Sequence, residues 1–487
     1  MYRDIKMCYQ VKSSIVILVS LFVLASCSGE KQKSEKQKPN ILLITADDHG
    51  IQLGCYGDNI ARTPNLDKLA RQGVLFKNAY VSQASCSPSR SSILTGLYPH
   101  QNGQIGLSHR GFSMRNGIPN LVATLKQNGY RTGILGKLHV QPENEYPFDF
   151  KDFATHPMRD VIRVADTSRT FIQSSEDPFF LYVNFCDPHV KFFKQVKGIP
   201  KNPYDSAMVK PFPWQGIDQP EELARIAGYY NCVARLDEGI GMLLKTIEDL
   251  GVMDNTLIIY VGDHGAPFTR GKGSCYESGI KIPFIMKYAD VKANIQSEKL
   301  VSTLDILPTI LEASNSKFDS PIEGYSLFKT LAGEKDAGRK YLFSEFTFHT
   351  HRHFSPRRAV RNDRYKLIHN LLPGDKALHN PSIDGDMAYR LSRDEKYNET
   401  KVREAFDLYL NPTEFELYDL KEDPYEFVNL ASDPNYASEF NELKEALQNW
   451  REETNDPLLN DSIFNAHLEQ TRLDIANNTK KRKILKK

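Results

Sequence analysis

Short apolar runs that end in polar residues recur along the first two thirds of the chain. The runs Asn40–Thr45, Thr132–Leu135, Phe179–Phe185 and Thr256–Val261 continue into A-D-D-H-G, G-K-L-H, C-D-P-H and G-D-H-G. Continuous apolar strands of this length are typical of a sheet that is buried on both faces. The pattern therefore predicts four strands of one central sheet.

Helical patterns lie between these runs. Asn120–Asn128 and Glu221–Leu250 place apolar residues at helical spacing, and Gly251 follows as a stop signal. Strands that alternate with helices predict an α/β domain with a large mixed, mainly parallel sheet flanked by helices. Ligands bind beyond the carboxyl ends of such strands, so we expect the four polar breaks to meet in one site.

The sequence pattern changes after residue 335, where the segments become shorter and contain many Tyr, His, Asn and Pro residues. Tyr365–His369 and Glu416–Asp419 are expected to be strands of a small antiparallel sheet, and Ala437–Glu453 a closing amphipathic helix. The last residues are strongly basic and are interpreted as a solvated tail. The resulting division is a catalytic domain over 39–335, a smaller C-terminal α+β domain over 336–470 and a basic tail over 471–487.

The N-terminus has the features of an export signal. Basic residues precede an apolar run, Ile15–Ala25, that is too short to span a bilayer but suits a signal peptide. The following L-A-S-C resembles a bacterial lipobox, which predicts a lipoprotein signal peptide over 1–27, lipidation of Cys27 and a flexible tether over 28–38. We expect a lipid-anchored protein of the bacterial cell envelope, facing the periplasm or the cell surface. Simple secretion, with Cys27 incidental, is the alternative.

The net charge and the cysteine spacing limit the kinds of ligand and partner that the chain is expected to bind. The chain has 487 residues and a formal net charge of +1, so no global field draws it to nucleic acid, and any anionic substrate must be attracted locally. No C-x-x-C spacing occurs, which argues against a thiolate zinc site. Outside the cytoplasm some thiols could pair, but the sequence leaves their partners open. The cysteines beyond the export segment are Cys55, Cys86, Cys186, Cys232 and Cys275.

Two neighbouring acids follow the first strand. Buried together, the Asp47 and Asp48 carboxylates would repel each other unless a divalent cation lay between them, and oxygen ligands favour Ca²⁺ or Mg²⁺. An acidic turn is the alternative, since Asp is common in turns. Asp263 and His264, in an equivalent break, favour the metal site.

The stretch Cys86-Ser87-Pro88-Ser89-Arg90 is suited to the first turn of a helix. Cys86 would then lie at a helix N-terminus, where free amides favour anions, and Arg90 would face the same side one turn later. These residues alone leave open a reactive thiol or a buried structural cysteine.

The longer stretch C-S-P-S-R-S-S-I-L-T-G resembles the C-x-P-x-R…T-G signature of type I sulfatases, in the alkaline phosphatase superfamily. In that family a maturation enzyme oxidises the cysteine to formylglycine, so the resemblance implies this change at Cys86 and that enzyme as a partner. The resemblance covers about residues 38–455, and the other motifs agree in order. They are the metal residues Asp47 and Asp48, the catalytic Lys137 and His139, His189, the metal residues Asp263 and His264, and the last catalytic Lys272.

The resemblance also implies the chemistry. Residue 86, with the acids and His264, would hold Ca²⁺, or Mg²⁺, although many sulfatases have Asn where His264 stands. A hydroxyl of hydrated formylglycine would attack sulfur, and the second hydroxyl would later expel sulfate. Arg90, Lys137, His139 and Lys272 would surround the sulfuryl oxygens, and His189 would protonate the leaving atom.

Some stretches resemble one branch, the sulfamidases, which remove the N-sulfate of glucosamine from heparan sulfate. They are His100–Gly103, Tyr146–Phe150, Lys366–Leu371 and Trp450–Pro457. Against this, Lys272 stands where the animal sulfamidases have Arg. The alternatives are an O-sulfatase acting on another glycosaminoglycan or an aryl sulfate, a phosphoester hydrolase and an inactive glycan-binding lipoprotein. Contacts to the sulfated oligosaccharide are expected from His100, His349, His351 and Arg352, although the last three could equally form a polar loop.

Overall fold

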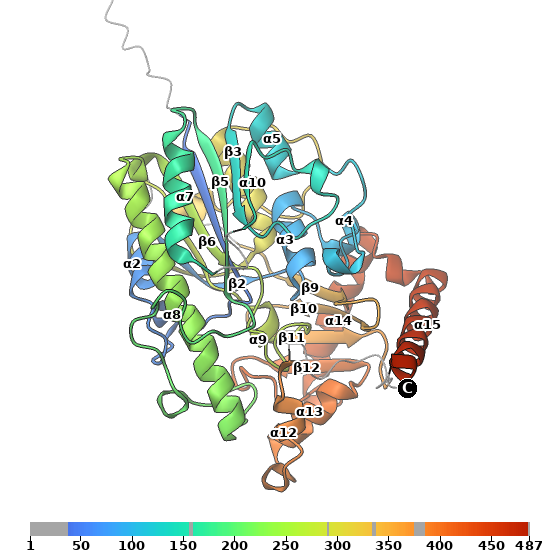
Figure 1. Ribbon diagram of the computed structural model, residues 1–487. Helices are drawn as coiled ribbons and strands as arrows, with labels where there is room; N and C mark the ends of the chain where they lie inside the picture. Colours follow the sequence, from blue (N-terminus) through green and yellow to red (C-terminus); the bar gives the residue numbers. More distant parts are fainter. Residues whose placement is uncertain (1–37, 155–158, 290–291, 334–337, 375–384, 486–487) are drawn as a thin grey trace, which may run out of the picture. The chain divides into compact units, whose positions relative to one another are not determined.

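The four predicted strands lie side by side in one sheet (Figure 1). The computed structural model describes residues 38–154, 159–289, 292–333, 338–374 and 385–485. Neighbouring strands among the four are all parallel, so their carboxyl ends lie at one edge. In spatial order they are β3 (Arg131–Gly136), β5 (Phe179–Pro188), β1 (Asn40–Asp47) and β6 (Thr256–Gly262).

Further strands make the sheet mixed, as predicted. The full order is β4-β3-β5-β1-β6-β7-β2-β8, and β7 runs antiparallel to both of its neighbours. The added strands are β4 (Phe150–Asp152), β7 (Phe284–Lys287), β2 (Val74–Tyr80) and β8 (Ile295–Ser302).

Helices cover both faces of this sheet (Figure 1). Ile41 and Leu43 of β1 pack into one core layer, whereas Leu42 and Ile44 pack into the other. Because successive strand residues point to opposite faces, a strand buried on both sides needs an unbroken apolar run. The first layer has helices α3 (Cys86–Thr95), α5 (Leu121–Gln127) and α10 (Ile306–Ser314), and the second α2 (Pro64–Gln72), α7 (Val161–Gln173) and α8 (Pro220–Asp249).

A second, antiparallel sheet follows, as predicted. Its order is β12-β11-β10-β9, and the helix α14 (Ala437–Glu453) packs against one face through Leu443, Leu447 and Trp450. The opposite face packs against Cys275 and Tyr276, so this sheet supports the loop that carries Lys272. The strands are β9 (Leu342–Phe348), β10 (Phe354–Arg361), β11 (Tyr365–Asn370) and β12 (Phe415–Asp419).

The C-terminal residues differ from the prediction. The expected tail over 471–487 begins inside α15, a helix over Asp461–Leu485. Thr471 is buried, and His467 packs against the ring of Phe354. The basic run that begins at Lys480 drew attention away from these contacts earlier in the helix. The predicted tail is therefore in large part a helix.

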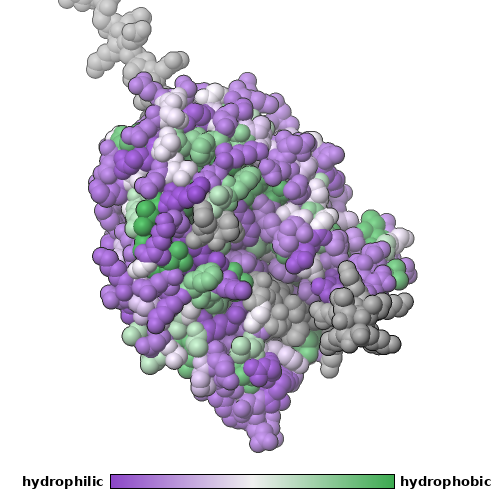
Figure 2. All heavy atoms as spheres, in the orientation of Figure 1, coloured by the Kyte–Doolittle hydropathy of each residue, from purple (hydrophilic) through white to green (hydrophobic). Residues whose placement is uncertain are grey.

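The export segment, including Cys27, lies outside the described residues. Within the described part, no helix is both long and apolar enough to cross a membrane. The face shown in Figure 2 is mainly hydrophilic, with hydrophobic residues in small separate groups. The five later cysteines are free thiols, so none of them forms a disulfide.

Candidate active site

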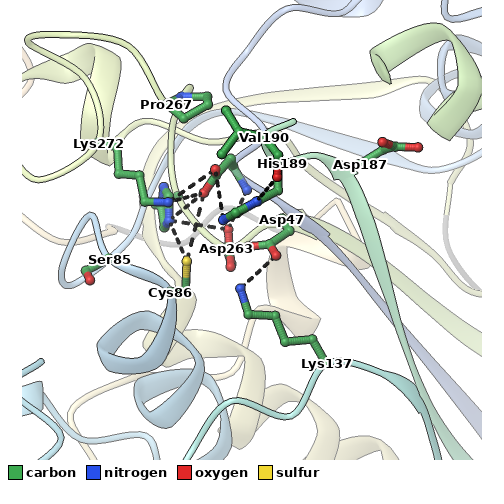
Figure 3. Close-up of polar contacts among 12 residues, drawn as sticks. Asp47, Ser85, Cys86, Lys137, Asp187, His189, Val190, Asp263, Pro267 and Lys272 are labelled. Carbon is green, nitrogen blue, oxygen red and sulfur yellow. Dashed lines mark hydrogen bonds and ion pairs between the residues drawn. The ribbon is translucent and has the colours of Figure 1, made fainter. Parts of the chain in front are cut away.

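The polar breaks meet at the carboxyl edge of the large sheet, as the strand pattern predicted. Asp47 ends β1, and Asp263 directly follows β6. Lys137 and His189 directly follow β3 and β5. Figure 3 shows Asp47, Asp263, Lys137 and His189 converging around Cys86.

Three carboxylates form the centre of the site. The side chains of Asp47, Asp48 and Asp263 are all fully buried. Asp48 has a backbone φ of 66°, in the left-handed region, and its N–H donates to Asp263 Oδ1 at 2.9 Å. This uncommon backbone turn holds the two acids together, as strained residues often do at functional sites.

Three cations lie against these acids. Lys137 Nζ is 2.7 Å from Asp47 Oδ2, and Lys272 Nζ is 2.9 Å from Asp48 Oδ1. Arg90 Nε is 2.9 Å from Asp263 Oδ2. These six charges balance, so a divalent cation added to them would leave the pocket positive and suited to an anion.

Burial and the neighbouring charges together set the pKa values of the acids. Burial opposes ionisation of Asp48, but Lys272, His189 and His264 outweigh it and hold its pKa far below the usual range. Burial and the Asp47 carboxylate raise the pKa of Asp263. A cation shared by these carboxylates would relieve that repulsion.

Cys86 begins helix α3, as predicted, and faces the acids. Its Sγ lies 3.3 Å from His264 Nε2 and 3.9 Å from Asp48 Oδ1. Burial raises the pKa of the thiol although Lys137 and Lys272 oppose this. The nucleophilic form of cysteine is the thiolate, so this environment argues against an enzyme that uses Cys86 as a thiol.

The donor atoms fit a hard divalent cation. One possible ligand set is Asp47, Asp48, Cys86 and His189, and a second is Cys86, Asp263 and His264, with the ligand atoms of each set within 4.8 Å of one another. His264 Nδ1 donates to the carbonyl oxygen of Gly265 at 2.9 Å, and its Nε2 lies 3.0 Å from Asp48 Oδ1, so a ring that gave up its Nε2 proton to bind a cation would offer the Nε2 lone pair beside this carboxylate. The set is rich in carboxylate oxygens, which favours Ca²⁺ or Mg²⁺.

The two other predicted histidines lie beside this cluster. The side chain of His189 is 25% exposed, and its Nε2 is 3.7 Å from Asp48 Oδ2, so solvent or substrate can reach it. His139 is partly buried, with a backbone φ of 57°, and its Nε2 is 2.7 Å from His109 Nδ1. Burial and Lys137 lower the pKa of His139, so its ring is neutral at physiological pH.

Several residues that support the site have no recognisable signal in the sequence. Asp187 points away from the cluster in Figure 3 and binds Arg235 of α8 through both oxygens, each 2.7 Å from a guanidinium nitrogen. Arg159 also binds Asp187 and donates to the carbonyl oxygen of His189 at 2.8 Å. These pairs fix the loop that carries His189. Asp187 belongs to the D-P-H stretch, but no sequence pattern near it indicates which residues it binds.

The predicted substrate contacts separate in the structure. His349 Nδ1 is 3.3 Å from the Ser85 hydroxyl, directly before Cys86. His351 is exposed and stacks on Phe112, and Arg352 is half-buried beside it. His349 is therefore the member of this group that the structure brings to the rim of the site.

His100 is not brought into the acidic cluster. It is buried, its Nδ1 lies 2.6 Å from Glu345 Oε2, and its ring meets that of Trp450 edge-on. These contacts join α4 (Pro99–Asn102) to the second sheet and its helix. A structural role accounts for His100, and the predicted contact with substrate has no geometric support.

The stretch around Asp456 has a similar structural role. Arg358 binds both oxygens of Asp456, at 2.8 and 2.9 Å, and Arg451 Nε lies 2.8 Å from Asp456 Oδ2.

We expect Asp456→Ala to lower the free energy of unfolding by about 3–5 kcal/mol, because it removes the carboxylate that pairs with two buried guanidinium groups. Urea denaturation measures this, with Asp407→Ala as the control. Asp407 pairs with Arg393 at the surface, so that loss should stay below about 1 kcal/mol. Equal losses in the two variants would contradict the structural role.

The fold and the site define a class of hydrolase. A mixed α/β sheet presents buried carboxylates, cations and a helix-terminal cysteine at one edge, an arrangement suited to holding a divalent cation and transferring an anionic group. A family model described as "Sulfatase" matches residues 39–316, and one described as "N-sulphoglucosamine sulphohydrolase, C-terminal" matches residues 262–401. The chain belongs to the sulfatase family, as the signature around Cys86 predicted.

Individual relatives agree with this placement. The chain is 35% identical to the human N-sulphoglucosamine sulphohydrolase, over 90% of this chain and 93% of that protein. It is 31% identical to an ulvan-active sulfatase of Formosa agariphila, over 93% of this chain and 91% of the relative. A solved structure of a protein in complex with its substrate D-glucosamine-2-N,6-O-disulfate has a TM-score of 0.64, 21% identity and coverage of 86% of this chain and 99% of that one, which shows a shared fold.

Proposed function

We propose that this protein removes the N-sulfate of glucosamine from heparin or heparan sulfate fragments. The observation that carries a sulfatase function is the convergence of buried acids and cations on Cys86, within the family signature. The sugar assignment rests on the human relative and on the match of residues 262–401 to the C-terminal model.

Cys86 is proposed to be converted to formylglycine by a maturation enzyme. When hydrated, that aldehyde supplies one hydroxyl to attack sulfur and a second whose loss of a proton releases sulfate. The helix N-terminus at Cys86 orients this residue and favours anionic groups beside it. Asp47, Asp48, Asp263, His264 and residue 86 would hold Ca²⁺, with Mg²⁺ as the alternative, and the bound ion would polarise the attacking oxygen.

The cations of the pocket are assigned to the sulfuryl oxygens. Lys137, Lys272 and Arg90 already meet near Cys86, and their charges stabilise negative charge that shifts in the transition state. His139, as a neutral ring, contributes a hydrogen bond and no charge. Other residues of this chain already hold these cations and the His139 ring in place, so their side chains need to move little during the reaction.

His189 is the proposed acid for the leaving nitrogen. Its Nδ1 lies 2.6 Å from the carbonyl oxygen of Val190, so Nδ1–H donates there and Nε2 is left to hold the transferred proton. The Arg159 and Arg235 contacts to the Asp187 loop keep this ring at the edge of the cluster.

Of the three alternatives, one keeps a specific observation in its favour. An O-sulfatase is supported by the 31% identity to the ulvan-active sulfatase. A phosphoester hydrolase shares the architecture, but the full signature at Cys86 argues against it. An inactive glycan-binding protein would lack part of the site, and every predicted core residue is present.

The proposed location is the bacterial cell envelope, through a lipid on Cys27. The L-A-S-C stretch after a short apolar run supports this proposal. Partition of the full chain into detergent, lost in Cys27→Ala, tests it. A wild-type chain found wholly in the aqueous phase would overturn it.

The test of function compares two sugars. Protein co-expressed with its maturation enzyme is incubated with Ca²⁺ and either N-sulfoglucosamine or N-acetylglucosamine 6-sulfate, and released sulfate is measured. Release from the N-sulfated sugar alone is expected. Release from the 6-sulfate alone would retain a sulfatase and overturn the N-sulfate assignment. Mass analysis of residue 86 confirms that each sample is mature.

A further inference from the structure

A short loop beside Cys86 carries a histidine that none of the family motifs above includes. His109 lies in the turn η2 (Ser108–Arg110). The backbone N–H of Ser108 donates to the hydroxyl of Ser87 at 2.9 Å, and that of Leu107 donates to the carbonyl oxygen of His349 at 3.3 Å. The loop is thus tied to the residue that follows Cys86 and to the rim of the site.

His109 reaches His139 through a direct contact between the two rings. His109 Nδ1 and His139 Nε2 are 2.7 Å apart, the ring centroids are 4.9 Å apart and the ring planes differ by 18°. The imidazoles therefore meet nearly edge to edge in one plane, which is the geometry of an N–H···N hydrogen bond. Burial lowers the pKa of both rings, so one neutral ring donates and the other accepts.

The direction of this hydrogen bond decides what His139 offers a substrate. Its Nδ1 is buried and has no hydrogen-bond partner among the residues that the structure describes. If His109 donates, that Nδ1 carries a proton and can donate to an anionic oxygen. If His139 donates, its Nδ1 is a bare lone pair, which repels an anion. Lys137 and Arg90 lie close enough to His139 to lower its pKa. Because both are positively charged, this part of the site attracts an anion.

We propose that His109 is a positioning residue for the sulfatase reaction: its Nδ1–H donates to His139 Nε2 and keeps the proton of His139 on Nδ1, as a donor to a sulfuryl oxygen. The inference rests on the proposed function, because it assigns a donor toward a sulfate group. A residue that hydrogen-bonds to one ring nitrogen of an active-site histidine orients the ring and fixes its tautomer. Loss of such a residue typically lowers activity about 10- to 100-fold, as it does for metal-bound histidines.

Two substitutions that differ by one methylene test this. In His109→Asn the side-chain amide nitrogen is as many bonds from Cβ as Nδ1 of histidine, whereas in His109→Gln it is one bond further. We expect His109→Asn to stay within about 3-fold of wild-type kcat, and His109→Gln to lose about 10- to 100-fold in kcat with little change in KM. Equal activity in the two variants would overturn the proposal.

Nitrogen-15 NMR of histidine-labelled protein provides a readout that is independent of activity. His139, assigned by its loss in His139→Gln, is expected to carry its proton on Nδ1 in the wild type and in His109→Asn, and to become a mixture of tautomers in His109→Gln. A wild-type proton on Nε2 would overturn the proposal. If mature protein released no sulfate from either sugar while these tautomers were as expected, the proposed function would fail and the orienting contact would stand.

Discussion

Replacing Cys86 by alanine is expected to lower sulfate release by about 10⁴-fold or more, because it removes the nucleophile. The Cys86 side chain is buried, so the variant loses a small apolar group and is expected to fold. Far-ultraviolet circular dichroism and released sulfate, measured on the same sample, check the two expectations. Turnover within 100-fold of the mature wild type would contradict the role of residue 86.

Cys86→Ser separates attack from release. A serine hydroxyl that loses its proton to solvent can attack sulfur and break the bond from sulfur to nitrogen, while the leaving amine takes a proton from His189. The resulting sulfate ester has no second hydroxyl to expel sulfate, so we expect one sulfate bound per protein and no turnover. Intact mass spectrometry detects that adduct. Multiple turnovers by Cys86→Ser would instead indicate the direct hydroxyl chemistry of a phosphoester hydrolase.

The sequence predicted the site well where the chemistry follows a strand. Asp47, Lys137, His189 and Asp263 each come directly after an apolar run, so parallel pairing alone brings them together. The pairing order, in which β1 lies between β5 and β6, has no local signal, but any parallel order would have placed the breaks at the same edge.

The residues that support the site could not be predicted in this way. The bond from Asp187 to Arg235 spans 48 positions, and that from Arg358 to Asp456 spans 98, so neither pair has a sequence spacing to recognise. His100 was assigned to the substrate because it is a histidine in a stretch typical of the sulfamidase branch. In the structure His100 is buried and its ring contacts the Glu345 carboxylate, so this histidine stabilises the packing between two parts of the fold.

Removing divalent cations is expected to lower activity by about 10³-fold, because an ion in such a site supplies several kcal/mol of transition-state stabilisation. Dialysis against a chelator, followed by return of Ca²⁺ or Mg²⁺, measures the loss and shows which ion restores sulfate release. Full activity in the chelator would contradict the metal site.

The same ion is expected to stabilise the fold. The three acids lie at a fully buried centre, and burial together with Asp47 raises the pKa of Asp263, so the carboxylates oppose one another without a shared cation. At a Ca²⁺ concentration 100 times its Kd, the free energy of unfolding should rise by about 2.7 kcal/mol. Urea denaturation with and without Ca²⁺ measures this increase.

Asp263→Asn should abolish the calcium-dependent increase, since the amide keeps an acceptor for Arg90 but removes one of the three negative charges. Asp419→Asn is the matched control. Its carboxylate binds Arg364 in the second sheet, so this variant changes the baseline stability but should keep the full response to Ca²⁺. A response that survives in Asp263→Asn would place the ion elsewhere. A response retained equally in both variants would show that it reflects general screening of surface charge and does not depend on an ion held by the three buried acids.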